Sequence, residues 1–189
     1  HRLTTQSTIF LSDRPAVAVD LTAAHMWEAV VPSGFGLEVD AQACAIATVR
    51  DGVRHRSNGV RGRRLTLPDE HVTTLDGVPI TTPALTWLDC APLMSWQDLV
   101  AMGDGLLRAG LVTMKDLHDV IVWGRGRRGI RAARGAYEIL DGRSESPGES
   151  WVRAKVVRDG LPRPACNVTV VVAGHVFRLD IGWEEYKVA

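Results

Sequence analysis

The spacing of apolar residues changes twice along this chain. Apolar residues recur at every second position in short runs before residue 82, and at intervals of three and four from residue 82 to residue 140. The period of two returns at 168–172 and 176–181. A period of two predicts strands and a spacing of three and four predicts amphipathic helices. The sequence therefore predicts an α+β fold in which a helical region lies between strand-rich segments.

The first part of the chain is expected to be mixed, with strands at 16–19, 43–50 and 53–57. Asp51 and Gly52 separate the last two runs and predict a hairpin turn. One helix is expected between the strands, from Asp20 or Thr22 to Val30, just before Pro32.

Four later helices have a recognisable N-cap residue just before their first turn. Thr82, Ser95, Thr113 and Ser146 each stand where an N-cap is expected, and Pro83 and Pro147 follow two of them. A further helix is expected at 130–140. The helices between residues 83 and 142 predict a small bundle.

The segment GRSESPGES, at 142–150, is the clearest linker signal. Together with the change to helical spacing at residue 82, it leads us to predict three units: a strand-rich region at 1–82, a helical region at 83–142 and a partial αβ domain at 143–189. Because the chain begins with His1 and ends as a third C-terminal strand is expected, we also expect a longer parent protein.

The composition limits which cellular location and which binding partners are expected for this chain. The 46% apolar content fits a folded protein, and 22 basic residues balance 22 acidic ones. Attraction to nucleic acid must therefore be local. Three widely spaced cysteines and histidines without metal-binding spacing indicate neither a disulfide framework nor zinc. With no membrane span or signal peptide recognisable, a cytoplasmic protein is expected.

Two clusters of arginine are each close to +5 in charge. The first lies at 50–64 and the second at 124–134, with glycines between the arginines that allow close approach to phosphate. Either cluster alone could equally be a solvated surface. The predicted DNA-binding residues are Arg54, Arg56, Arg61, Arg63, Arg64, Arg125, Arg127, Arg128 and Arg131.

Two carboxylates near the C-terminus could bind a metal ion. Asp180 lies on the strand face opposite Phe177 and Leu179, and Glu149 is expected at the start of a helix. Together they could bind Mg²⁺ or Mn²⁺ and activate water for attack on phosphorus. Glu149 could instead complete a capping box with Ser146, and Arg153 could form an ion pair with it four residues later.

The motifs SESPGESWVR, DGLPRP and VFRLDIGWEEYKVA, at 144–189, resemble an actinobacterial family related to very-short-patch-repair endonucleases of the PD-(D/E)xK type. This resemblance implies an incomplete restriction-endonuclease-like domain, in which Glu149 and Asp180 are the metal-binding catalytic acids and Arg153 a catalytic helix arginine. Glu185 and Lys187 are read as part of a turn, so the rest of the site is expected beyond Ala189.

The region at 20–142, with DGVPITTPALTWLDCA and GDGLLRAGLVTMKDL, is similar to AbiE-type abortive-infection antitoxins. That resemblance implies a missing N-terminal winged helix. Two functions follow: a Mg²⁺-dependent DNA endonuclease in the full-length form, or a non-catalytic DNA-binding regulator or antitoxin on the same scaffold. A defence-system interaction module is a third, and a homodimer or a defence-system protein is an expected partner besides DNA.

Overall fold

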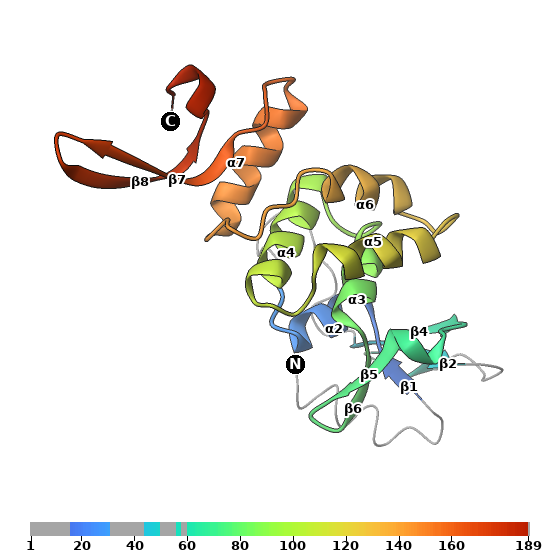
Figure 1. The fold of residues 1–189 in the computed structure, drawn as a ribbon. Coiled ribbons are helices and arrows are strands. Elements are labelled where there is room, and N and C mark those ends of the chain that lie inside the picture. Colours follow the sequence, from blue (N-terminus) through green and yellow to red (C-terminus); the bar gives the residue numbers. More distant parts are fainter. Residues whose placement is uncertain (1–15, 31–43, 50–55, 58–59, 189) are drawn as a thin grey trace.

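The computed structural model describes residues 16–30, 44–49, 56–57 and 60–188. Figure 1 shows a sheet at one end, helices in the middle, and a helix with a projecting hairpin at the other end. The strands are β1 (Ala16–Ala18), β2 (Cys44–Val49), β3 (Arg56–Ser57), β4 (Val60–Leu65), β5 (Val72–Leu75), β6 (Val78–Thr81), β7 (Ala165–Val172) and β8 (His175–Gly182). The helices are α2 (Asp20–Met26), α3 (Pro83–Cys90), α4 (Trp96–Arg108), α5 (Met114–Trp123), α6 (Ile130–Tyr137) and α7 (Pro147–Arg158), with 3₁₀ turns at Asp69–His71 and Glu184–Tyr186.

The larger sheet is mixed and has the strand order β3-β4-β2-β1-β6-β5. β1 pairs antiparallel with β2 and parallel with β6, while β2 and β4 are parallel. The sheet confirms the expected α+β class. The sequence patterns predicted β1 and β2 but did not predict β4, β5 and β6. The expected hairpin turn at Asp51 lies outside the described residues.

The helix starts follow the side-chain caps read from the sequence. Ser95 accepts the backbone N–H of Asp98, and Thr113 forms a capping box with Asp116. Thr82 caps α3 in the same way, with Pro83 as the first helical residue. These caps satisfy N–H groups that have no partner within the helix, which is why such residues mark the boundaries well.

The first helix is shorter than the sequence predicted. α2 ends at Met26 and not at residue 30, because Glu28 adopts a φ of 54° that a continuing helix does not allow. Trp27 then donates its indole N–H to the carbonyl oxygen of Thr81 at 2.9 Å, which ties this end of α2 to β6.

The main core lies among the helices. It is centred on α3 and α4, where Trp87, Leu88, Leu99 and Met102 are buried, and it includes Ala154 of α7. α7 therefore packs against the helical layer and shares its core. The boundary expected near residue 142 stays a prediction, since this segment connects two helices that are packed together.

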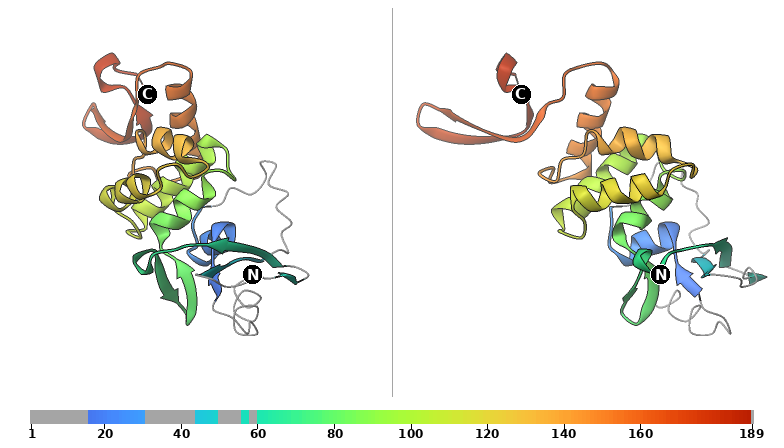
Figure 2. Two further views of the ribbon diagram at one scale, coloured as in Figure 1. Left: turned by 90° about the vertical axis from the view of Figure 1, so that its right-hand side faces the viewer. Right: turned by 45° about the vertical axis from the view of Figure 1, so that its right-hand side comes forward.

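The last part of the chain is a helix followed by a two-stranded sheet, β7 and β8. The turn between them uses positive φ angles at Ala173 and Gly174, the geometry of a type I′ hairpin. The expected third strand is absent from the described residues, where the chain forms the 3₁₀ turn Glu184–Tyr186 after Trp183. Two further views show the hairpin and the sheet at opposite ends of the helices (Figure 2). In the part of the chain described here, no helix is long and apolar enough to cross a bilayer.

Candidate nucleic-acid interface

Two basic segments that are far apart in sequence meet at one pocket beside the sheet. Arg63 and Arg64 come from the first predicted cluster, and Arg127 and Arg128 from the second. The pocket has a volume of about 460 Å³. Its lining residues are Gly62, Arg63, Arg64, Leu65, Asp89, Pro92, Leu93, Arg127 and Arg128. The fold thus combines arginines that the sequence could only treat as two separate clusters.

Arg63 is held by a buried carboxylate. It lies on β4 and donates a hydrogen bond to Asp20, the first residue of α2, whose side chain is 2% exposed. Asp20 has a φ of 52°, a conformation that costs free energy in residues other than glycine. The ion pair fixes the guanidinium of Arg63 at the edge of the pocket.

Arg127 is held in the same manner, by the buried carboxylate of Asp89 in α3. Its Nη2 donates to Oδ1 of Asp89 at 2.9 Å, and its guanidinium lies 4.5 Å from the centre of the Trp123 ring. The carboxylate and the aromatic ring both favour the charged guanidinium. Arg127 is therefore fixed in position before any partner binds.

The turn that carries Arg127 and Arg128 is seated closely on the start of the α3–α4 connection. Gly129 has a φ of 85°, and a Cβ atom added there would lie 2.7 Å from the Cδ and backbone N atoms of Pro92. Only glycine fits this contact without movement of the backbone. This close approach brings the second arginine cluster up to the pocket.

The acids behind the arginines do not cancel the positive charge. Four arginines and one aspartate, Asp89, line the pocket, and Asp20 and Asp89 form ion pairs with Arg63 and Arg127. Burial raises the pKa of the Asp89 carboxyl to about 6, with the Arg127 charge opposing the shift. The pocket therefore has an excess of positive charge and is suited to a phosphate or another anion.

The remaining predicted DNA-binding arginines are not among the residues that line this pocket. Arg125 and Arg131 are exposed but are not among the lining residues. Arg56 pairs with Arg61 across β3 and β4. Both backbones therefore lie at the same edge of the sheet as β4, which carries Arg63. Arg54 lies outside the described residues.

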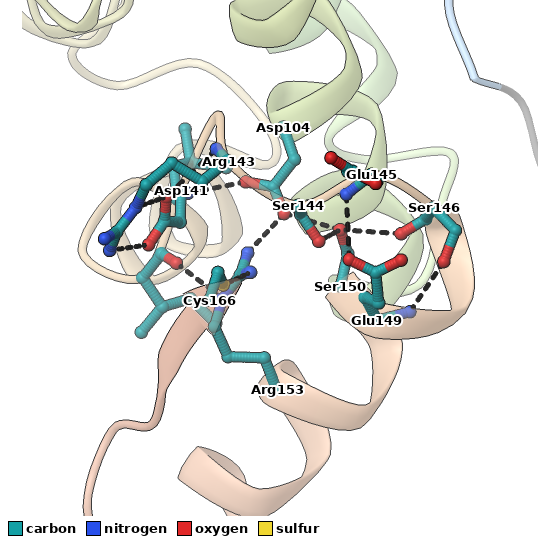
Figure 3. Close-up of polar contacts among 12 residues, drawn as sticks. Asp104, Asp141, Arg143, Ser144, Glu145, Ser146, Glu149, Ser150, Arg153 and Cys166 are labelled. Carbon is teal, nitrogen blue, oxygen red and sulfur yellow. Dashed lines mark hydrogen bonds and ion pairs between the residues drawn. The ribbon is translucent and has the colours of Figure 1, made fainter. Parts of the chain in front are cut away.

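Arg153, predicted as a catalytic arginine, is fully buried, and Figure 3 shows its contacts with Asp104 and Cys166. It donates to the carboxylate of Asp104 in α4, to the Ile139 carbonyl oxygen at 3.2 Å and to Cys166 Sγ at 2.8 Å. The ion pair expected with Glu149 is replaced by the one with Asp104. Its observed contacts tie α7 to α4 and to β7.

Glu149 and Asp180 occupy different settings. The Glu149 carboxylate accepts the backbone N–H of Glu145 at 2.8 Å, and its own N–H donates to the hydroxyl of Ser146 at 3.2 Å (Figure 3). The helix start is therefore capped, although the carboxylate reaches Glu145 and not Ser146. Asp180 is exposed on β8 and forms no hydrogen bond or ion pair with the described residues.

A metal ion bound by Glu149 and Asp180 stays a prediction. No group of three or more His, Cys, Asp or Glu side chains suited to a metal ion occurs among the described residues. Glu149 already uses one oxygen to cap its helix. Because Mg²⁺ prefers six oxygen ligands, these two acids do not by themselves fit it well, and we derive no chemical step from it.

A second polar cluster was missed by sequence reasoning. Asp104 accepts the hydroxyl proton of Ser150 at 2.6 Å and the backbone N–H of Asp141 at 2.7 Å. Burial raises the pKa of the Asp104 carboxyl, and the nearby Arg153 opposes that shift. The signal that could have found Asp104 and Asp89 is the same: each is an acid within the apolar stripe of a predicted helix.

The described residues thus form a mixed sheet covered by helices, with an arginine-lined pocket beside them, and this defines an α+β domain suited to an anionic partner. The chain belongs to the AbiEi antitoxin C-terminal domain family, whose model matches residues 17–140. The resemblance of 20–142 to AbiE-type antitoxins is confirmed. The match ends before α7, so the endonuclease interpretation of 143–189 stays a prediction.

Similar proteins occur in mycobacteria. Two uncharacterized proteins, from Mycobacterium tuberculosis strains CDC 1551 / Oshkosh and H37Rv, are each 32% identical to this chain over 110 residues. The aligned region is 58% of this chain and 41% of each relative, so the chain spans less than half the length of the relatives it matches. No solved structure matches this chain.

Proposed function

We propose that this chain is the antitoxin module of a toxin–antitoxin or phage-defence system, and that it acts as a non-catalytic regulator that contacts DNA. Membership of the AbiEi antitoxin family supports an antitoxin role and a toxin protein as partner. The basic pocket supports the contact with DNA. In this proposal the domain binds and positions, and it performs no chemistry on the DNA.

The observation that carries the DNA contact is the meeting of Arg64 and Arg128 at one pocket. They come from segments more than sixty positions apart, and the fold places both beside the fixed guanidinium groups of Arg63 and Arg127. Four arginines around one pocket can contact neighbouring phosphates of one strand. An arrangement of this kind gives affinity without sequence preference, because phosphates carry no base identity.

The buried acids contribute to binding indirectly. Asp20 and Asp89 hold Arg63 and Arg127 in fixed conformations, so less side-chain entropy is lost when phosphate binds. Exposed arginines without such partners lose more rotational freedom on binding. The two buried ion pairs therefore fix two of the four arginines that line the pocket before a phosphate binds.

The test is a DNA-binding titration over a series of salt concentrations. Replacing Arg64 and Arg128 with glutamine should weaken binding and reduce the slope of log affinity against log salt by about two, since about 0.9 counterions are released per phosphate contact. The matched control replaces exposed Lys155 and Arg158 of α7 with glutamine, which removes the same charge elsewhere. An unchanged slope in the pocket variant, or an equal loss in the control, would exclude the pocket as the DNA contact.

A further inference from the structure

The β7–β8 hairpin has an open edge and uncovered apolar side chains. It extends away from the helices in Figure 1 and in the right-hand view of Figure 2. Val171, Val172, Val176 and Phe177 are between 51% and 70% exposed. Among the described residues β8 has β7 as its one strand neighbour, so its other edge presents backbone groups without a partner strand.

The pairing within the hairpin shows which residues of β8 face this outer edge. Val172 pairs with His175 across the two-residue turn, and such a turn joins these residues by a backbone hydrogen bond. In an antiparallel pair, hydrogen-bonded and non-hydrogen-bonded positions alternate. The odd-numbered residues of β8 therefore direct their N–H and C=O groups toward β7. The even-numbered residues, from Val176 to Gly182, direct theirs toward the open edge.

The C-terminal turn leaves that edge accessible. Trp183 and Val188 exchange backbone hydrogen bonds of 2.7 and 3.2 Å, which fold the chain back after β8. Since Trp183 is odd-numbered, its backbone groups point to the side of β8 on which β7 lies. Val188 therefore returns on that side, and the outer edge stays uncovered by the described residues.

We propose that the outer edge of β8 pairs antiparallel with the same edge of a second copy of this chain, around a two-fold axis at Leu179. This register joins Arg178 to the partner's Asp180, and Asp180 to the partner's Arg178. It uses even-numbered residues on both strands, as backbone pairing at this edge requires. The two hairpins then form one continuous four-stranded sheet.

Charge selects this register over its neighbours. A shift of two residues in one direction places Arg178 opposite the partner's Arg178, and a shift in the other places Asp180 opposite the partner's Asp180. Like charges directly opposite each other destabilise a strand pair, whereas opposite charges stabilise it. The register centred on Leu179 therefore avoids both repulsions and satisfies both charges.

The partners of these side chains within one copy are compatible with the pairing. Arg178 forms an ion pair with Glu145 and donates from Nε to Asn167 Oδ1 at 3.2 Å. Both members of that ion pair are half-exposed, and a guanidinium has five N–H groups, so Arg178 can contact Glu145 and a second acid. Asp180 forms no ion pair with the described residues and is available.

The pairing also brings the apolar faces of the two β8 strands into contact. Phe177, Leu179 and Ile181 lie on one face of β8, and in this register Leu179 lies opposite the partner's Leu179 while Phe177 lies opposite the partner's Ile181. A two-stranded sheet is marginally stable alone, and sheets of three or more strands with an apolar face are more stable. A two-fold axis lets one edge serve both copies.

The test is the molar mass of the 189-residue chain over a concentration series. We expect a monomer–dimer equilibrium, and expect Arg178→Asp or Asp180→Arg alone to weaken dimerisation about ten- to a hundredfold because each creates two like-charge pairs. The double variant Arg178→Asp with Asp180→Arg should restore the dimer. The proposal would be overturned if the wild-type chain stayed monomeric at every concentration. It would also be overturned if the dimer formed with unchanged affinity in both single charge reversals.

Cross-linking tests the register itself. Leu179→Cys should form a disulfide between copies under oxidising conditions, because residues directly opposite in a non-hydrogen-bonded pair lie about 4.5 Å apart at Cα. Phe177→Cys is the matched control, since its counterpart in the second copy is several residues away along the strand. Equal cross-linking of both variants would contradict the register.

Discussion

Arg153 of α7 and Asp104 of α4 form an ion pair in which both side chains are enclosed by protein, at 0% and 2% exposure. Ser150 and the backbone N–H of Asp141 also donate to Asp104, so both of its oxygens are satisfied. The pair joins the helix after the expected linker to the helical layer that the antitoxin family covers. It is a structural connection between two segments that the sequence assigned to separate units.

Removing one member of this pair should strongly destabilise the protein. Arg153→Met leaves the Asp104 carboxylate buried without its counter-charge, which costs about 3–5 kcal/mol in unfolding free energy. Replacing both residues, with Asp104→Leu and Arg153→Met, should cost much less, because no unpaired charge remains. Urea unfolding measures both values.

The ion pair of Arg143 with Asp141 provides the control, because its guanidinium is exposed although its carboxylate is buried. The Arg143 side chain is 65% exposed and its Nη2 lies 2.7 Å from Asp141 Oδ2, so Arg143→Met should cost about 1 kcal/mol or less. Equal losses for Arg143→Met and Arg153→Met would show that burial does not strengthen the connection between α7 and α4.

The contrast between Arg153 and the helix caps shows which features the sequence could predict. Ser95 and Thr113 cap residues three positions later, so local spacing was sufficient to identify them. Arg153 finds Asp104 49 positions away, and the sequence offered only the nearby Glu149 as a partner. Local rules therefore located the helices but not the contacts between them.

The same limit applies to the basic pocket. Arg127 pairs with Asp89 38 positions away, and Arg63 pairs with Asp20 43 positions away. The sequence predicted both arginine clusters from composition. It could not place them at one pocket, because that depends on the parallel pairing of β2 with β4 and on the seating of the turn after α5.

Gly129 and Gly126 allow the seating of that turn to be tested. Both have φ angles near 85°, but a Cβ atom at Gly126 meets no atom within 4 Å, whereas one at Gly129 meets Pro92. Gly126→Ala should cost about 1–2 kcal/mol through backbone strain alone. Gly129→Ala adds overpacking and should cost about 2–4 kcal/mol.

Gly129→Ala should also weaken DNA binding although it removes no charge, since it displaces the turn that carries Arg127 and Arg128. Binding titrations are compared under conditions where both alanine variants are folded by circular dichroism. If Gly126→Ala weakens binding as much as Gly129→Ala, the contact with Pro92 does not position the arginines.

Asp89 should give the unfolding free energy a distinct dependence on pH. Burial raises the pKa of its carboxyl from 3.8 to about 6, so between these values the native state binds more protons than the unfolded state. Stability therefore falls as pH rises from about 4 to about 6, by about 2–3 kcal/mol for this group, and stays lower above that range.

Asp89→Asn should remove that contribution from the difference in unfolding free energy between a pH below 3.8 and a pH above 6, which together bracket both pKa values of the Asp89 carboxyl. Asp76→Asn is a matched control, because Asp76 is exposed in the β5–β6 turn and asparagine tolerates its φ of 51°. A profile for Asp89→Asn that coincides with that of Asp76→Asn and of the wild type would contradict the role of burial at Asp89.

Asp180 distinguishes the metal hypothesis from the strand-pairing proposal. If Asp180 and Glu149 bind Mg²⁺ or Mn²⁺, the ion stabilises the native state, and the thermal midpoint should rise with metal concentration in the wild type and not in Asp180→Asn. In a longer parent protein, the same variant should lose metal-dependent DNA cleavage and keep DNA binding. Strand pairing instead predicts that Asp180→Asn weakens dimerisation with or without EDTA.

The double variant Arg178→Asp with Asp180→Arg separates the metal hypothesis from the strand-pairing proposal most sharply, because it moves the carboxylate by two positions. It should keep the dimer if strands pair at this edge, and it should lose every response to Mg²⁺ if Asp180 is a ligand.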